Sequence, residues 1–467
     1  MWSLRCLIHL KTNTSKYFGI DFVSAGVLKT KDSKTTMKTI QCTKFLLIFF
    51  IFSCLTPTSK ASEKPLKDFQ LSIIPFVGTE GTSVIDYRYR LSVNFFAGAT
   101  GGIEGFEAGG FLNITNGYLQ GIQLAGFGNL VSGDIQGLQA SGFANVGGGD
   151  RLGFAASGFA NITGGNHQGF AGAGFANVVG RNHTGFSAAG FANVTGGSYM
   201  GFAGAGFANV AGGSYTGFAG AGFANVTGGS YTGFAGAGFA NVTGENHTGF
   251  SAAGFANISG GHVEGLQISG FLNIARSLQG LQLGFINVAD TITDGVAIGF
   301  LSIVRKGGLR QVEIAASDVS PFSASFRIGL PKFYNIFSYN MRPWGDETFY
   351  TLGYGVGSHI KMDQDLSLQI EFHSMAFHKD WVLHWNQDKD KLDILNEGRF
   401  MLSYNPRAHF ELFGGLVIYN QLYSENEAKG ITGKDIAPSY VFHEGQWGDY
   451  QSRWWPGARA GIRFIIR

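Results

Sequence analysis

Six aromatic or imidazole side chains recur at one position of an internal repeat, and they are the residues whose type and spacing could best do chemistry. Coils stacked on one another would line these residues up as a continuous aromatic strip, and such a strip could stack against sugar rings. The alternative is a solvated row of turn residues that covers the edge of the coils. The residues of this possible ligand strip are His167, His183, Tyr199, Tyr215, Tyr231 and His247.

Groups suited to catalysis are scattered along the rest of the repeat region. A polysaccharide-cleaving β-helix needs acids and bases gathered on one face, whereas the carboxylates here are far apart in the sequence. Serine-hydrolase, zinc-protease and phosphate-loop motifs are absent from the sequence. We therefore expect a non-enzymatic protein with no catalytic residues, no cofactor and no metal site. The carboxylates between residues 105 and 300 are Glu107, Asp134, Asp150, Glu245, Glu264, Asp290 and Asp294.

The composition also points away from an ordinary globular enzyme. Only 14% of the residues are charged, whereas Gly occurs 72 times and Phe 43 times among 467 residues. This composition favours repeat solenoids or membrane barrels. The net charge of +2 gives no indication of a nucleic-acid partner.

An asparagine recurs every 16 residues through the middle of the chain. Each is preceded by Gly-Phe-x, and a second Gly column runs from Gly105 to Gly265. The glycine content disfavours helices, so we expect each repeat to be one coil of a β-solenoid with coils about 4.8 Å apart. The expected structural ladder consists of Asn113, Asn129, Asn145, Asn161, Asn177, Asn193, Asn209, Asn225, Asn241, Asn257 and Asn273.

Within such a coil we expect the stacked phenylalanines to fill the core, with Gly and Ala at corners and in the narrow interior. The alternative is a large membrane barrel in which each repeat is one strand and a turn. The two Phe columns lie five residues apart and would face opposite sides of one straight strand, which favours the solenoid with a corner between them. Strand candidates at 69–77 and 84–97 would cap the solenoid or join a barrel.

The last repeats are shorter by one residue between their glycines, as in Gly280-Leu281-Gln282-Leu283-Gly284-Phe285-Ile286-Asn287. This unit and the segments Gly121-Ile122-Gln123 and Gly265-Leu266-Gln267 resemble the Gly-x-Gln-x-Gly-x-x-Asn repeats of bacterial surface-repeat proteins. The resemblance covers roughly residues 90–305, and most central units depart from it by carrying Ala in place of Gln. It implies an exported protein and says nothing about chemistry.

The composition changes near residue 305, and period-two alternation begins. Eight strands are predicted, and after the second the connections alternate between short and long, which is typical of an outer-membrane β-barrel. Tyr350, Tyr354, Trp454 and Trp455 are candidates for its aromatic girdles, and a soluble β-sandwich is the alternative. The predicted strands lie near 310–317, 322–330, 333–341, 348–360, 366–378, 399–405, 408–420 and 457–467.

The N-terminal region has the pattern of an export signal. Residues 37–61 combine basic Lys38 and Lys44 with a short apolar run and a small-residue cleavage site, which predicts a signal peptide. Residues 1–36 would then be an untranslated or disordered extension, and Cys54 could instead be a lipidated mature N-terminus.

The predicted fold is all-β, a glycine-rich 16-residue-repeat β-solenoid followed by a C-terminal antiparallel β-barrel of about eight strands. We expect N-terminal strands at 62–104, the solenoid at 105–304 and the barrel at 305–467. The predicted function is an outer-membrane, cell-surface protein of a Gram-negative bacterium, with the barrel as anchor and the solenoid as a display or binding surface. Its partners would be outer-membrane lipids and a glycan or surface partner. The alternatives are an outer-membrane pore and a secreted or lipid-anchored glycan-binding solenoid.

Overall fold

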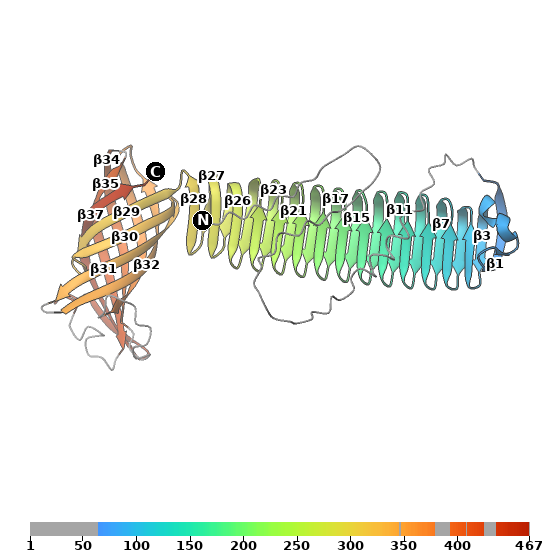
Figure 1. Cartoon of the computed structure of the whole chain (residues 1–467). Helices are drawn as coiled ribbons and strands as arrows, with labels where there is room; N and C mark the ends of the chain where they lie inside the picture. The colour runs from blue at the N-terminus through green and yellow to red at the C-terminus, as the bar shows by residue number, and fades with distance from the viewer. Residues whose placement is uncertain (1–63, 345–346, 379–392, 408, 425–435, 467) are drawn as a thin grey trace, which may run out of the picture. The chain divides into compact units, whose positions relative to one another are not determined.

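The computed structural model describes residues 64–344, 347–378, 393–407, 409–424 and 436–466. The predicted extension (residues 1–36), the predicted signal peptide (residues 37–61) and Cys54 lie outside these residues. The predicted fold class is confirmed: a β-solenoid of about 14 coils with a repeat of about 16 residues is followed by a closed, eight-stranded antiparallel barrel (Figure 1). No helix among the described residues is long and apolar enough to cross a membrane.

Each solenoid coil contains one seven-residue strand and one four-residue strand, and each strand pairs in parallel with its equivalent 16 residues later. The long strands form one wall: β5 (Ile103–Gly109), β7 (Leu119–Ala125), β9 (Ile135–Ser141), β11 (Arg151–Ser157), β13 (His167–Ala173), β15 (His183–Ala189), β17 (Tyr199–Ala205), β19 (Tyr215–Ala221), β21 (Tyr231–Ala237), β23 (His247–Ala253) and the eight-residue β25 (His262–Ser269). The short strands form the other: β4 (Ala97–Thr100), β6 (Leu112–Thr115), β8 (Gly128–Val131), β10 (Ala144–Gly147), β12 (Ala160–Thr163), β14 (Ala176–Val179), β16 (Ala192–Thr195), β18 (Ala208–Ala211), β20 (Ala224–Thr227), β22 (Ala240–Thr243) and β24 (Ala256–Ser259).

The two ends of the array differ from its centre. The N-terminal segment forms β1 (Leu66–Ile74), β2 (Val77–Gly78), the 3-10 turn η2 (Gly81–Asp86) and β3 (Arg88–Asn94). β1 pairs with β3 and β3 with β5, so this segment adds coils to the solenoid. At the other end, β26 (Leu272–Leu283), β27 (Ile286–Ile298) and β28 (Leu301–Lys306) are longer or irregular coil segments.

A glycine with positive φ recurs in each long strand, where neighbouring coils approach closely. Gly201 has φ +132° and lies between Met200, which is exposed, and Phe202, which also faces outward. The strand keeps its alternation: Tyr199 and Ala203 are buried, and Gly201 takes the inward position between them without adding a side chain to the interior. A Cβ on the equivalent Gly217 would collide with the carbonyl oxygen of Gly201 in the preceding coil.

The prediction that stacked phenylalanines fill the solenoid core is wrong. Both Phe columns face outward and are about 40% exposed, for example Phe202 at 38% and Phe207 at 41%. The physical reason is that Phe202 lies between inward-facing positions of an alternating strand and so faces outward, while the second Phe lies at a bend between the two strands. The interior instead holds small, amide and aromatic-polar side chains, such as Ala203, Asn209 and Tyr199.

The barrel closes because its first strand pairs with its last, Glu313 opposite Arg463. All eight predicted strands are present, and several extend further than predicted. They are β29 (Leu309–Ser317), β30 (Phe322–Leu330), β31 (Phe333–Trp344), β32 (Glu347–Lys361), β33 (Leu366–His378), β34 (Asp393–Arg407), β35 (Phe410–Ser424) and β37 (Tyr450–Ile465). A short additional strand, β36 (His443–Trp447), pairs with the start of β37.

Candidate functional site

The six residues of the predicted ligand strip lie inside the solenoid. They are between 1% and 3% exposed, and their rings stack along the array with centroids 4.7–5.2 Å apart. The hydroxyl of Tyr199 donates to the carbonyl oxygen of Phe202 at 2.6 Å, and Tyr215 and Tyr231 make the same bond in their own coils. These side chains therefore form a buried column, which neither a surface ligand nor the solvent can reach.

Burial also sets the ionisation of this column. It lowers the pKa of His167 to about 3 and that of His183 and His247 to about 4, so all three imidazoles are neutral at pH 7. Burial raises the pKa of the three tyrosines. Neutral rings can stack without mutual repulsion, and no described residues form a group of three or more metal-ligating side chains.

The repeated asparagines form a continuous internal ladder. Asn209 donates from Nδ2 to Oδ1 of Asn225 at 2.9 Å and accepts the same bond from Asn193. The same amide nitrogen also donates to the carbonyl oxygen of Gly220 at 2.8 Å, in the wall facing it. The ladder therefore links consecutive coils and ties the two walls together. It begins at Asn94, passes through all eleven predicted asparagines and ends at Asn287.

The glutamines of the atypical repeats also point inward. Gln139 donates to Gln123 at 2.6 Å, and Gln282 donates to Gln267 at 2.8 Å. The central repeats place a buried alanine at this position, for example Ala203. The variation between Gln and Ala that separates the central repeats from the surface-repeat pattern is thus a variation inside the core.

Sequence reasoning missed one charged residue of the same interior. Arg151 occupies the position of His167 one coil earlier and is 1% exposed, and its Nε donates to Thr163 at 3.0 Å. Burial lowers the pKa of this guanidinium to about 10. Arg151 aligns with the His and Tyr column in the repeat, and this alignment is the sequence feature that could have identified it as an interior residue. Its charge and its polar neighbours in the sequence instead suggested an exposed position.

Two rows of exposed phenylalanines are the main apolar feature of the solenoid exterior. The first Phe row runs from Phe154 to Phe250 with ring centroids 4.5–5.1 Å apart. The second Phe row runs from Phe96 to Phe271 with centroids 4.7–5.1 Å apart. Both rows follow the axis of the array.

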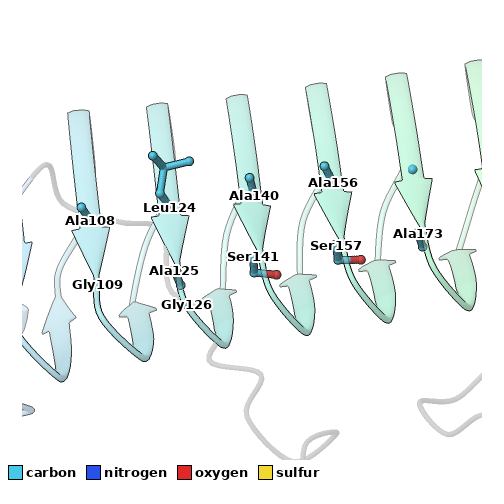
Figure 2. Close-up of a pocket in the computed structure, with 11 residues that line it drawn as sticks. Ala108, Gly109, Leu124, Ala125, Gly126, Ala140, Ser141, Ala156, Ser157 and Ala173 are labelled. Atoms are coloured by element: carbon cyan, nitrogen blue, oxygen red, sulfur yellow. The ribbon is translucent and has the colours of Figure 1, made fainter.

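A shallow groove of about 690 Å³ runs across the long strands of five consecutive coils, from β5 to β13. In each coil its lining residues come between the positions of the two Phe rows, and most are Gly, Ala or Ser. Figure 2 shows Leu124, Ala140 and Ala156 in successive coils along it. We call the two rows and the groove together the Phe face.

The barrel interior holds an ion-pair network of four glutamates and four arginines. Arg327 lies 2.7 Å from Glu313 and 2.6 Å from Glu371, and Arg463 lies 2.7 Å from Glu313 and 2.5 Å from Glu411. Glu397 pairs with Arg399 at 2.5 Å, and Arg459 pairs with Glu313 at 2.9 Å. All eight side chains are at most 3% exposed. Opposite charges, most of them on different strands, therefore pair inside the barrel.

The predicted girdle residues divide between the two sides of the barrel wall. Trp454 is 37% exposed on the outside, and the rings of Tyr350 and the neighbouring Tyr339 lie 6.0 Å apart. Trp455, however, is 1% exposed and stacks on Tyr419 in the interior. Trp455 is thus an interior residue, because adjacent positions of a strand face opposite sides.

No protein family, curated protein or solved structure matches this chain.

Proposed function

We propose that this chain is a non-enzymatic outer-membrane protein of a Gram-negative bacterium, with the barrel as its membrane anchor and the solenoid as a rigid arm for display or binding. The observation that carries the proposal is the inverted polarity of the barrel. Its outer wall is apolar, with Ile314, Phe372 and Leu416 each more than half exposed, whereas its charged side chains face inward.

A lipid environment makes this inversion favourable. In water, the exposed Leu, Ile and Phe side chains would lose hydrophobic stabilisation of roughly 25 cal/mol per Å² that remains uncovered. In a bilayer the same wall faces acyl chains, and closure of the barrel satisfies the backbone hydrogen bonds that a membrane cannot satisfy. The exposed Trp454 and the Tyr339–Tyr350 pair fit the interfacial aromatic positions of such a barrel.

The packed interior favours an anchor over the alternative function of a pore. Eight-stranded barrels are usually filled by their own side chains. Here the buried ion pairs occupy the lumen, with Arg463 reaching across to Glu411 and Gln369. A protein of this kind should give no steady current in a planar lipid bilayer, and a stable ohmic conductance would move the proposal to the pore.

Glycan binding through the column of His167 to His247 loses its support, since these rings are buried. A binding role for the solenoid must therefore use its exterior. The proposal assigns no catalytic residue and no cofactor.

The even strand number bears on the side of the membrane that the solenoid occupies. Both chain ends of the barrel, at Leu309 and Ile465, leave from the end where all three connections (β30 to β31, β32 to β33 and β34 to β35) are four residues or fewer, whereas both long connections, β33 to β34 and β35 to β37, are at the opposite end. In outer-membrane barrels the short turns are periplasmic. We therefore place the solenoid on the periplasmic side, and the earlier expectation of cell-surface exposure becomes the alternative.

Two readouts test the proposal. The full chain from the outer-membrane fraction should migrate differently on a gel when boiled and unboiled, as folded barrels do. A Ser214→Cys variant places a thiol on an exposed turn of a chain whose native cysteines all precede residue 62. A membrane-impermeant maleimide should label it only after the outer membrane is permeabilised. A soluble protein without a mobility shift would overturn the anchor, and labelling of intact cells would reverse the sidedness alone.

A further inference from the structure

We propose that the Phe face of the solenoid is a homodimer interface, occupied by the Phe face of a second copy of this chain lying parallel to the first. The inference goes beyond the proposed function, and only the parallel orientation rests on it. Two barrels inserted in one membrane with the same sidedness hold their solenoids in the same direction.

The exposed apolar area is too large for a face left in water. Between Phe106 and Phe300, 19 phenylalanines are 36–47% exposed. If a Phe side chain offers roughly 200 Å², these residues together leave about 1,500 Å² uncovered. A typical monomer has a largest apolar patch of about 300–600 Å², and a stable complex buries about 800 Å² on each partner. The Phe rows alone therefore exceed what a stable dimer needs.

The charge distribution argues for a second copy as the occupant of the face. Between residues 106 and 300, all of which the structure describes, neither Phe row nor the groove residues between them include an ionisable side chain. Most charges of this span lie in turns or in the interior, as with Asp150, Arg181 and Arg151, and Glu264 is exposed on β25 outside both rows and the groove. A phospholipid headgroup or an acidic glycan would need a cation on the face, whereas a second apolar face does not.

The periodicity and relief of the face make it self-complementary. Both Phe rows repeat at an axial spacing of about 4.8 Å, and the groove of mostly small residues lies between the row positions in the coils from β5 to β13. A row of rings of one copy can therefore lie in the groove of its partner through these coils without losing register. A two-fold axis parallel to the solenoid relates the copies, which gives the isologous contact usual in homodimers. Identical side chains that interdigitate in this way also form the dry interfaces of stacked β-structures.

Site-specific cross-linking tests the interface in the full chain. Ala156→Cys places one thiol in the groove, and Ser214→Cys places one in a polar turn as the matched control. With a short bismaleimide in isolated outer membranes, the Ala156→Cys chain should give a dimer band at least tenfold stronger than the control. The unboiled lanes of the same gel report the barrel separately, so failure of the dimer and failure of the anchor are distinguishable. Equal cross-linking of the two variants would overturn the interface.

A set of ridge variants tests whether the Phe rows hold the dimer. Changing Phe175, Phe191 and Phe207 to Ser removes aromatic area, whereas changing the same three residues to Tyr keeps the ring stack and serves as the folding control. Mass photometry of the detergent-solubilised chain should give a dimer for the wild type and a dissociation constant raised roughly 100-fold or more by the Ser changes. The Tyr changes should weaken the dimer less. A monomeric wild type at micromolar concentration, or a monomer that retains phospholipid in stoichiometric amounts, would overturn the proposal.

Discussion

The solenoid and the barrel share an inverted surface, but they satisfy their buried polar groups in different ways. In the solenoid, Asn209 bonds to Asn225, an identical and uncharged residue 16 positions away. In the barrel, Arg463 bonds to Glu313, an oppositely charged residue 150 positions away. The solenoid interior is thus a translational ladder, and the barrel interior is a cross-linked network.

Symmetry explains the difference. A solenoid column places like residues on top of one another at about 4.8 Å, so a column of ionised residues would accumulate like charges. Amides escape this limit because each one both donates and accepts. Inward positions of the barrel come from different strands with unrelated sequences, so opposite charges can face each other across the lumen. Buried charge is therefore common in the barrel and rare in the solenoid, where Arg151 and Glu107 are the charged residues of the described interior.

The largest expected effect comes from breaking the barrel network. Arg463→Met removes the cation that lies between Glu313 and Glu411 and leaves both carboxylates underpaired in the interior. We expect a loss of about 3–5 kcal/mol, the usual result of breaking a buried ion pair, measured by urea unfolding of the protein in detergent.

The matched control for this variant is Arg305→Met. Arg305 pairs with Asp290 at 2.7 Å, but both side chains are solvent-exposed. Its loss should change stability by less than about 1 kcal/mol. Equal losses of stability from Arg463→Met and Arg305→Met would contradict the expectation that the buried ion pairs matter more than the exposed one.

A slightly smaller effect is expected from the glycine column of the solenoid. Gly217 has φ +127°, and an added Cβ would meet the carbonyl oxygen of Gly201. Gly217→Ala should therefore destabilise the array by about 2–4 kcal/mol, read as a lower midpoint of thermal unfolding by circular dichroism. Gly398→Ala in the barrel is the control, since the nearest atom to its Cβ would be 4.0 Å away. A tolerated Gly217→Ala would contradict the close approach of the coils.

A moderate effect should follow from interrupting the asparagine ladder. Asn209→Ala removes three donated bonds, to Asn225, Gly220 and Ala203, and leaves buried acceptors without these partners. We expect a loss of about 1–3 kcal/mol, detected by hydrogen exchange as faster opening of the neighbouring coils. Asn182→Ala removes a similar amide bond to Asn166 at an exposed turn and should have a much smaller effect. Comparable losses of stability from Asn209→Ala and Asn182→Ala would mean that burial does not increase the contribution of the asparagine hydrogen bonds.

The smallest expected effect is a dependence on pH that originates in the solenoid column. His183 has its folded-state pKa lowered to about 4 by burial, whereas an unfolded histidine titrates near 6.5. Between these values the unfolded chain binds a proton that the folded chain does not. The stability from this residue is therefore complete above pH 6.5 and is lost as the pH falls toward 4.

A His183→Tyr variant tests the origin of this dependence, because tyrosine already occupies the column at Tyr199. The thermal midpoint of the variant should fall less between pH 7 and 4 than that of the wild type. Identical pH profiles would place the dependence elsewhere in the molecule.

The sequence alone determined the features that repeat or alternate. The 16-residue spacing of the asparagines indicated a stacked ladder, because only identical amides at a fixed period can bond to one another along an axis. The period-two pattern indicated eight strands of the barrel, since lipid and lumen select opposite residue types on alternate positions. The rhythm of short and long loops indicated how these strands connect.

Only the tertiary structure decided which side chains face inward in the solenoid. Phe202 is three residues from Tyr199, so the two face opposite sides of the strand, and the fold puts Tyr199 inside and Phe202 outside. The sequence shows the alternation but not which side of the strand faces the interior, and for this reason the Phe rows and the His and Tyr column were exchanged in the prediction. The pairing of Arg463 with Glu313 likewise depended on barrel closure, which brings together residues that no local pattern relates.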